Sequence, residues 1–321
     1  MKNNTKKITI ISIVLFALIF GALLVTATFT DLQVSQLLTK GTLPAGSYLA
    51  TGLFGVVLEC LGCTAPYIVG ALSLELIFVY TLRFMNNKKL RAILLVLLQI
   101  AAFAAYYAVA IDTLGYNIRH YHLEGTPAFM KAEIAFIALL LTFLSALAVN
   151  NLSDESIKRA PWVAFAVAFA IALSSITVTL IKEPFGRPRF RAMNYANDFS
   201  YYSRWYVLNG QPDKEWMRSY FSTSDACKSF PSGHTQSASM IFCIIMLKEL
   251  MGIKSKGKTA ALWIISIVWT GAVALSRIMV GAHFFSDVLV GGTIGFIFVI
   301  AGREIFVDKF EHIKSLKGKA K

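Results

Sequence analysis

The stretch KSFPSGHTQSASMIF, residues 228–242, joins a polar turn to the beginning of an apolar segment. Pro231, Ser232 and Gly233 predict a turn, because proline fixes one backbone angle and glycine tolerates the conformations that turns require. His234 then stands in the first turn of a helix that continues with mostly apolar residues. A histidine and a glycine turn at the start of such a helix need a reason, and the other segments of the chain supply it.

Long apolar segments like this one recur throughout the chain. Of its 321 residues, 56% are hydrophobic and 15% are charged, whereas an average soluble domain has about 25% charged residues. Runs of about 18 or more apolar residues predict membrane-spanning helices. We predict about eight of them, over residues 8–28, 65–84, 90–110, 132–150, 161–181, 234–251, 260–279 and 284–302. The predicted fold class is therefore all-α, a polytopic membrane helix bundle.

Two of the apolar segments need separate interpretation. Residues 47–63 are interrupted by glycines, so we expect a short interfacial or re-entrant helix there. The first apolar run follows the basic sequence MKNNTKK. It is longer than the core of about 7–15 residues that a signal peptide has. We therefore expect an uncleaved membrane anchor.

The net charge of +13 follows a topological pattern. If the N-terminus is cytoplasmic and the helices alternate, the inner segments hold 19 of the 31 Lys and Arg residues. Short cytoplasmic loops carry such an excess in membrane proteins. The pattern predicts a plasma (inner) membrane protein with both termini in the cytoplasm. The basic character thus needs no nucleic-acid partner, and the sequence carries no nucleic-acid-binding motif.

Three polar segments are expected on the periplasmic or extracellular side. They are KEPFGRPRFR (182–191), SFPSGH (229–234) and SRIMVGAHFFSD (276–287), and the helices around them could bring them together. Their cations would be costly in a partly buried pocket unless an anion joined them. They are Lys182, Arg187, Arg189, Arg191 and Arg277. Arginine forms paired contacts with phosphate oxygens, so a phosphate or diphosphate is the simplest ligand. Snorkelling toward the interface would explain Arg187 or Arg191, but it explains Arg277 poorly because its surroundings are apolar.

The turn at Ser232 and Gly233 fits such a ligand. Gly233 would let a ligand approach the backbone closely, and Ser232 can cap the helix or donate its hydroxyl to an oxygen. His234 stands beside them as a candidate proton donor. An N-cap followed by an interfacial histidine explains the same residues without any ligand, so this turn alone does not decide between the two interpretations.

The third segment favours chemistry. His283 and Asp287 are four positions apart and therefore share one helix face. A carboxylate that accepts from one imidazole nitrogen fixes the tautomer and leaves the other nitrogen free to attack. Arg277 precedes His283 by six positions, across Gly281, where the chain can turn. A histidine nucleophile, an orienting carboxylate and arginines form a set suited to phosphoryl transfer.

These segments resemble the three signature motifs of the phosphatidic acid phosphatase type 2 superfamily. That superfamily includes lipid phosphate phosphatases, diphosphatases of the undecaprenyl carrier, glucose-6-phosphatase and vanadium haloperoxidases. Its first motif, K-x6-R-P, is matched by Lys182 and Arg189, although Phe190 replaces the proline. The second, P-S-G-H, is complete at 231–234. The third, S-R-x5-H-x3-D, is complete at Ser276, Arg277, His283 and Asp287. The resemblance covers roughly residues 160–300.

The resemblance implies a role for each matching residue. His283 would attack phosphorus and form a phosphohistidine, Asp287 would hold its imidazole, and His234 would protonate the leaving oxygen. The phosphoryl oxygens would be bound by Lys182, Arg189, Ser232, Gly233 and Arg277, with Arg187 in support. The resemblance implies no metal and no other cofactor, because the cations and N–H groups would stabilise the transition state.

The resemblance also suggests a division of the chain. Residues 1–159 would form N-terminal transmembrane helices with an outer loop, 160–305 a phosphatase core, and 306–321 a basic cytoplasmic tail. The expected function is an integral-membrane, metal-independent hydrolase of a lipid phosphate or diphosphate at the outer membrane face. Its expected partners are the bilayer and the lipid phosphate. A phosphatase for a soluble phosphate ester, resembling glucose-6-phosphatase, and a non-enzymatic anion transporter remain alternatives.

Two features do not select a substrate. Residues 192–228 carry nine aromatic side chains, which would suit either a lid over the pocket or an interfacial aromatic belt. Glu75 lies in the middle of a predicted span, where a carboxylate is costly. It could pair inside the bundle or line a substrate groove, and pairing is the simpler interpretation.

Undecaprenyl diphosphate, phosphatidylglycerol phosphate and phosphatidate share the reacting group, so the sequence does not distinguish them.

Overall fold

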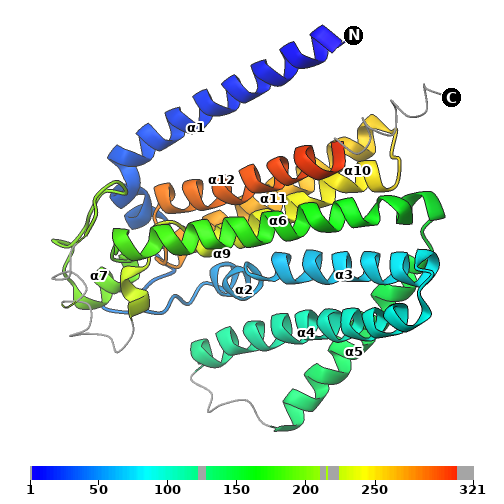
Figure 1. Ribbon diagram of the computed structural model, residues 1–321. Coiled ribbons are helices and arrows are strands. Elements are labelled where there is room, and N and C mark those ends of the chain that lie inside the picture. Colours follow the sequence, from blue (N-terminus) through cyan, green and yellow to red (C-terminus); the bar gives the residue numbers. More distant parts are fainter. Residues whose placement is uncertain (1, 122–127, 210–214, 216–223, 309–321) are drawn as a thin grey trace. The chain divides into compact units, whose positions relative to one another are not determined.

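The computed structural model describes residues 2–121, 128–209, 215 and 224–308, all within an α-helical fold. The described residues contain no β-strand, so the predicted fold class is confirmed. The order of the elements is shown in Figure 1. The α-helices are α1 (Lys2–Thr39), α2 (Leu53–Leu61), α3 (Thr64–Phe84), α4 (Lys88–Tyr121), α5 (Ala128–Asn150), α6 (Asp154–Phe185), α7 (Phe190–Ala196), α9 (Gly233–Ser239), α10 (Leu247–Leu250), α11 (Lys256–Met279) and α12 (Phe285–Gly302). Two 3₁₀ turns are η1 (Ser224–Cys227) and η2 (Met240–Met246), and η3 (Arg303–Asp308) is a π-helical turn.

Among the described residues, seven helical stretches are long and apolar enough to cross a membrane. Much of their surface consists of large apolar side chains turned outward; Phe136 is 68% exposed and Leu180 69%. Such exposure suits contact with lipid rather than water. The chain is thus a multi-pass membrane protein.

The predicted span over 234–251 has a more complex form. It is helical throughout, but consists of α9, the 3₁₀ turn η2 and the short α10 in succession. The end of α9 packs closely against α12, since a Cβ on Gly295 of α12 would lie 1.9 Å from the hydroxyl oxygen of Ser239. The segment 47–63, expected to hold a short helix, contains α2.

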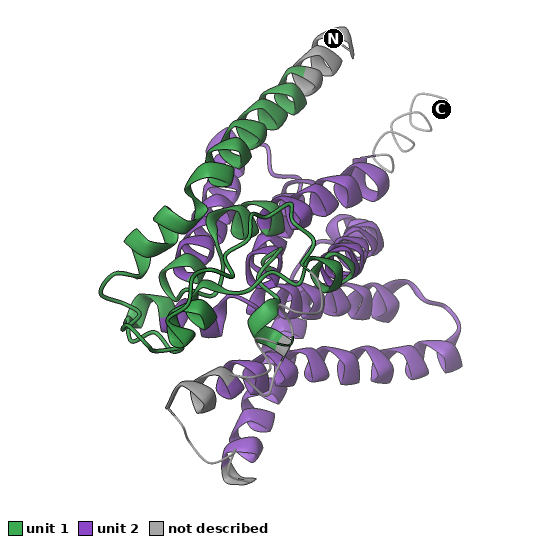
Figure 2. Cartoon of the chain, turned by 90° about the vertical axis from the view of Figure 1, so that its left-hand side faces the viewer, with its two compact units in different colours: residues 1–55, 180–232, 277–291 green, residues 56–179, 233–276, 292–321 purple. Residues whose placement is uncertain are grey.

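The described chain divides into two compact units, coloured separately in Figure 2. Unit 1 comprises residues 1–55, 180–232 and 277–291. Unit 2 comprises residues 56–179, 233–276 and 292–321. Helices α6, α11 and α12 contribute residues to both units. The domain boundaries expected from the sequence stay a prediction, because the units interleave along the chain.

Unit 2 is a packed set of helices. Its main core is formed by side chains of α3, α6, η2 and α12, including Val79, Ala166 and Met246. Small residues such as Ala160, Ala166 and Ala170 on α6 are fully buried and let neighbouring helices approach. Glu75 of α3 is also fully buried, and its Oε2 accepts a 2.7 Å hydrogen bond from Gln99 Nε2 of α4. This contact agrees with the interpretation that Glu75 pairs inside the bundle.

Unit 1 has its own small core, to which the end of α1, the segment around α7 and the α11–α12 turn contribute. Its buried members are Leu43, Ala50, Phe190, Ala192, Met193, Ala226, Cys227, Val280, Ala282 and Phe284. The turn depends on Gly281, whose φ of +66° favours glycine. A Cβ there would lie 2.8 Å from Leu43 Cδ2, and the Gly281 carbonyl accepts a 2.7 Å bond from Arg191 N. This core therefore fixes the turn that carries His283.

Candidate active site

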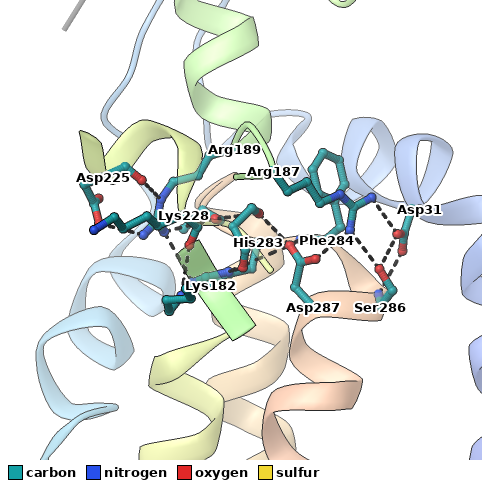
Figure 3. A network of polar contacts seen from close by, with 12 residues as sticks. Asp31, Lys182, Arg187, Arg189, Asp225, Lys228, His283, Phe284, Ser286 and Asp287 are labelled. Carbon is teal, nitrogen blue, oxygen red and sulfur yellow. Dashed lines mark hydrogen bonds and ion pairs between the residues drawn. The ribbon is translucent and has the colours of Figure 1, made fainter. Parts of the chain in front are cut away.

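The motif segments of unit 1 meet around His283, as Figure 3 shows. The first segment is the end of α6 with the turn that follows, the second the loop through η1 to Ser232, and the third the turn from α11 into α12. Direct contacts link all three: Arg189 lies 3.3 Å from His283, and Ser229 bonds to Asp287 at 2.5 Å. The predicted site residues Lys182, Arg189 and Asp287 are therefore brought together around His283.

The imidazole of His283 is buried, with 1% of its surface exposed. Its Nδ1 lies 2.6 Å from the carbonyl oxygen of Ser229. A carbonyl oxygen only accepts, so this contact assigns the ring proton to Nδ1. The lone pair is then on Nε2, which faces Nη1 of Arg189 at 3.3 Å. The nitrogen suited to nucleophilic attack thus lies next to a fixed positive charge.

The electrostatic surroundings keep this ring neutral. Burial, helped by the positive charges of Arg189 and Lys182, lowers the pKa of His283 to about 3, while Asp287 acts in the opposite direction. A neutral imidazole has the lone pair that a nucleophile needs. His283 is therefore in its reactive protonation state throughout the neutral pH range.

Asp287 lies near His283 but does not bond it directly. Its Oδ2 is 3.8 Å from Nδ1 of His283, which exceeds hydrogen-bond length. The same oxygen accepts from the Ser229 hydroxyl at 2.5 Å and from Phe284 N at 2.8 Å. Asp287 thus holds Ser229, and the Ser229 carbonyl holds the ring. Ser229 lies in the segment SFPSGH, just before the second motif, and the sequence gives it no role, because spacing alone does not indicate which backbone carbonyl faces a ring.

Arg189 occupies the centre of the cationic group. Its Nε donates to the Asp225 carbonyl at 2.8 Å and its Nη2 to Asp225 Oδ1 at 2.9 Å. Its Nη1 donates to the Ala282 carbonyl at 3.1 Å. Arg189 lowers the pKa of Asp225 to about 2, so this carboxylate is charged at neutral pH. Asp225 was not predicted; it lies in the aromatic insert, and only the fold places it against the arginine.

Lys182 is in the last turn of α6, and its ammonium donates to the Lys228 carbonyl at 2.9 Å. Arg277 is in the last turn of α11 and is 1% exposed. The Arg277 carbonyl accepts from Ala282 N at 3.1 Å and His283 N at 3.2 Å, which closes the turn before the nucleophile. The Lys182 ammonium is therefore held by the backbone that leads to Ser229, and the Arg277 backbone shapes the turn before His283.

Arg187 has a different environment from Arg189. It is 1% exposed and forms ion pairs with Asp287 at 2.5 Å and with Asp31 at 2.9 Å. Its guanidinium also stacks over the Phe284 ring, 4.2 Å from the ring centre. The sequence suggested that Arg187 supports phosphate binding, whereas these contacts favour an internal role.

The second motif is divided between the units. Ser232 is fully buried in unit 1, and its N–H donates to the Asp287 carbonyl at 2.9 Å. A Cβ on Gly291 would lie 2.2 Å from the Ser232 carbonyl oxygen, so α12 needs a glycine there. Gly233 begins α9 in unit 2, and His234 follows it. The role of His234 beside His283 stays a prediction.

The aromatic insert is described from 192 to 209 and again from 224. Tyr202 packs edge-on against Phe284, and Trp205 packs against Phe230. Trp205 Nε1 also donates to the Thr28 hydroxyl of α1 at 2.8 Å. Residues 210–214 and 216–223 lie outside the described residues, so the lid and the aromatic belt both stay interpretations. Within the described part of the chain, no three His, Cys, Asp or Glu side chains are grouped as metal ligands.

Comparison with known proteins agrees with this site. The chain is 27% identical over 134 residues to a lipid A 1-phosphatase of Rhizobium johnstonii (strain DSM 114642 / LMG 32736 / 3841). The alignment covers 42% of this chain and 44% of that protein, so the chain spans less than half of the length of this relative. No solved structure matches the chain significantly. The model of the PAP2 superfamily matches residues 163–311, which include all three motifs. Residues 163–311 are therefore similar to the PAP2 superfamily, as the motifs indicated.

Proposed function

We propose that the chain is an integral-membrane, metal-independent phosphatase that hydrolyses a lipid phosphate or diphosphate through a phosphohistidine. The observation that carries the proposal is the state of His283: buried, neutral, with its ring proton directed at the Ser229 carbonyl and its Nε2 facing Arg189. The match of residues 163–311 to the model of the PAP2 superfamily supports it.

In the first step, the lone pair on Nε2 of His283 forms a bond to phosphorus while the bond to the leaving oxygen breaks. The ring then carries a positive charge, because Nδ1 keeps its proton. That charge is stabilised by the Ser229 carbonyl at 2.6 Å and by the Asp287 carboxylate at 3.8 Å. In the proposed mechanism His234 donates the proton that the leaving oxygen takes.

In the second step, water attacks the phosphorus, the bond to Nε2 breaks and inorganic phosphate leaves. The His234 side chain, deprotonated in the first step, accepts the proton from the attacking water. His283 returns to the neutral form with its proton still on Nδ1. The two steps together consume one water and restore both histidines.

The positive charges of unit 1 are suited to the phosphoryl oxygens. Arg189 lies at the attacking nitrogen, and Lys182 is close enough to Arg189 and His283 for its charge to affect His283. Fixed cations stabilise the charge that spreads over the phosphoryl oxygens in the transition state. Lys182, Arg189 and Arg277, with Ser232 and the Gly233 backbone, are the proposed phosphate-binding groups. They would replace a metal ion in this role.

The proposed substrate is a lipid, for two reasons. The chain has seven helices suited to crossing a membrane among its described residues. The relative named above acts on lipid A. By the distribution of Lys and Arg, we place both termini in the cytoplasm and the site at the periplasmic or extracellular face of the plasma membrane.

The proposal is tested by phosphate release from purified protein in detergent, with EDTA present. The substrates are undecaprenyl diphosphate, phosphatidylglycerol phosphate, phosphatidate, lipid A and glucose 6-phosphate. We expect release from at least one lipid in EDTA, and its loss in His283→Ala. Release from glucose 6-phosphate alone would replace the lipid with a soluble ester. Activity that needs a metal, or that survives His283→Ala, would contradict the mechanism.

A further inference from the structure

The end of α1 presents polar side chains to the interior of unit 1. Asp31, Ser35 and Thr39 recur at intervals of four, and each is buried, with between 0% and 4% of its surface exposed. Residues four apart share one face of a helix. A carboxylate buried in a helix that is suited to spanning a membrane is costly and needs compensation. Helix α1 lies outside residues 163–311, so the family gives no reason for it.

The compensation for Asp31 comes from the region of the active site. Its Oδ2 pairs with Arg187 Nη2 at 2.9 Å. Its Oδ1 accepts from Ser286 N at 2.8 Å, and its Oδ2 accepts from the Ser286 hydroxyl. Ser286 immediately precedes Asp287 in the first turn of α12. Asp31 therefore binds both Arg187 and the first turn of α12, and these two hold Asp287, as Figure 3 shows.

Arg187 is saturated by partners inside the protein. Its Nε donates to the Ser203 carbonyl at 2.9 Å, Nη2 contacts Asp31, and Nη1 donates to Asp287 Oδ1 at 2.5 Å. Its planar fork, placed between two buried carboxylates, leaves this group with one net negative charge. Because every nitrogen has a partner and 1% of the residue is exposed, Arg187 is poorly placed to bind phosphate. It is well placed to fix a carboxylate.

We propose that Asp31 is a positioning residue for the nucleophile, acting through Arg187. Asp31 accepts a hydrogen bond from Arg187, and Arg187 also donates to Asp287. Asp287 in turn accepts from the Ser229 hydroxyl, and the Ser229 carbonyl contacts His283 Nδ1. A helix outside the family segment thereby sets the orientation of the ring. This inference rests on the proposed phosphatase activity, since it assigns a role within that reaction.

Loss of the Asp31 charge should move Asp287. In Asp31→Asn, one of the two oxygens that accept from Arg187 and Ser286 becomes an NH₂ group. An N–H donor then faces the N–H or O–H donors of these two residues, and the hydrogen bonds at that atom are lost. Arg187 would then be held by Asp287 alone among its carboxylates, and the pair could shift together. Nucleophiles tolerate little displacement, because a shift of about 1 Å costs about 100-fold in rate.

The test compares Asp31→Asn with the wild type in phosphate release. We expect kcat to fall by about 10- to 100-fold, the range for partners of ligating or reacting groups. We expect KM and the inhibition constant of vanadate, used as a phosphate probe, to stay within about twofold, because Asp31 does not touch the phosphate. The matched control is Asp198→Asn, an exposed carboxylate of the same unit that accepts from Ser200, for which no change in kcat is expected.

A double-mutant cycle separates positioning from general stability. If Asp31 acts through Arg187, Asp31→Asn should change kcat by less than about twofold in an Arg187→Gln background. If Asp31→Asn fails to fold, Asp31→Glu replaces it, with the same expected fall in kcat at constant KM, since its carboxylate is displaced by one methylene.

Each outcome bears on the inference in one direction. A fall in kcat alone that disappears in the Arg187→Gln background supports it. Unchanged kcat in the Asp31 variant, or independent losses that multiply in the cycle, would overturn it while the proposed phosphatase function stands. A wild-type protein that releases no phosphate from any substrate would overturn the function, and this inference with it.

Discussion

The Ser229 hydroxyl offers a sharp test of how the site is held together. Its bond to Asp287 Oδ2 is 2.5 Å long, and both residues are fully buried. Hydrogen bonds to charged groups contribute about 1.5–3 kcal/mol, and a buried acceptor that loses its donor keeps the cost of its lost hydration. In Ser229→Ala, Asp287 Oδ2 would keep the Phe284 N–H at 2.8 Å. We therefore expect a loss of about 2 kcal/mol in the free energy of unfolding, near the lower end of that range.

The chain offers a matched control for this substitution. The hydroxyl of Ser200 donates to Asp198 at 2.6 Å, the same pair of groups in an exposed position. Unfolding of both serine-to-alanine variants in mixed detergent would be followed by circular dichroism. The exposed pair should contribute much less than the buried one, because water competes for and screens surface contacts. Equal losses in both variants, or no loss in Ser229→Ala, would refute the reasoning that burial makes the Asp287 contact strong.

Three further predictions concern the remaining parts of the site. Asp225→Asn should tighten inhibition by vanadate about two- to fivefold, because a half-exposed carboxylate paired with Arg189 competes with phosphate for it; weaker inhibition would contradict this competition. The pKa of His283 is lowered to about 3 in the folded protein, whereas an unperturbed histidine in the unfolded chain has a pKa of about 6.5. When the pH falls below about 6.5, the unfolded state therefore binds a proton that the folded state does not bind. Wild type should therefore lose about 2 kcal/mol more than His283→Gln between pH 7.5 and pH 5 in detergent unfolding, and parallel losses would contradict the neutral buried ring. Gly291→Ala should reduce the yield of folded protein, since its Cβ would lie 2.2 Å from the Ser232 carbonyl oxygen, whereas Gly271→Ala, with nothing within 4 Å, should be neutral or stabilising; normal folding of Gly291→Ala would show that α12 can move away.

Much of the fold could be predicted from the sequence because membrane helices leave a direct compositional signal. The apolar runs predicted the long helices, with boundaries that differ by several residues. The first run was placed at 8–28, whereas α1 extends to Thr39. Polar residues such as Asp31 ended the apolar signal but not the helix, because unit 1 buries them. The 3₁₀ turn η2 inside the predicted span 234–251 has no compositional signature.

The candidate site could be predicted only where chemistry is encoded by spacing along the chain. The spacing of His283 and Asp287, four apart, predicts this pair, although the expected shared helix face is wrong, because His283 lies in the turn before α12 begins at Phe285. Ser229 acts through a backbone carbonyl, and Asp31 reaches Arg187 from 156 positions away, so neither follows from local spacing. One signal for Asp31 was present: an acidic residue directly after a long apolar run, where an uncompensated charge would be costly.

The central claim is that the phosphoryl group passes through a covalent intermediate on His283. The most direct test is the stereochemical course at phosphorus, measured with a phosphorothioate monoester that is made chiral by two oxygen isotopes and is hydrolysed in water of the third isotope. Each in-line displacement inverts the configuration, so attack by His283 followed by attack by water should give net retention. Net inversion would mean that water attacks the substrate directly, and it would contradict the phosphohistidine mechanism.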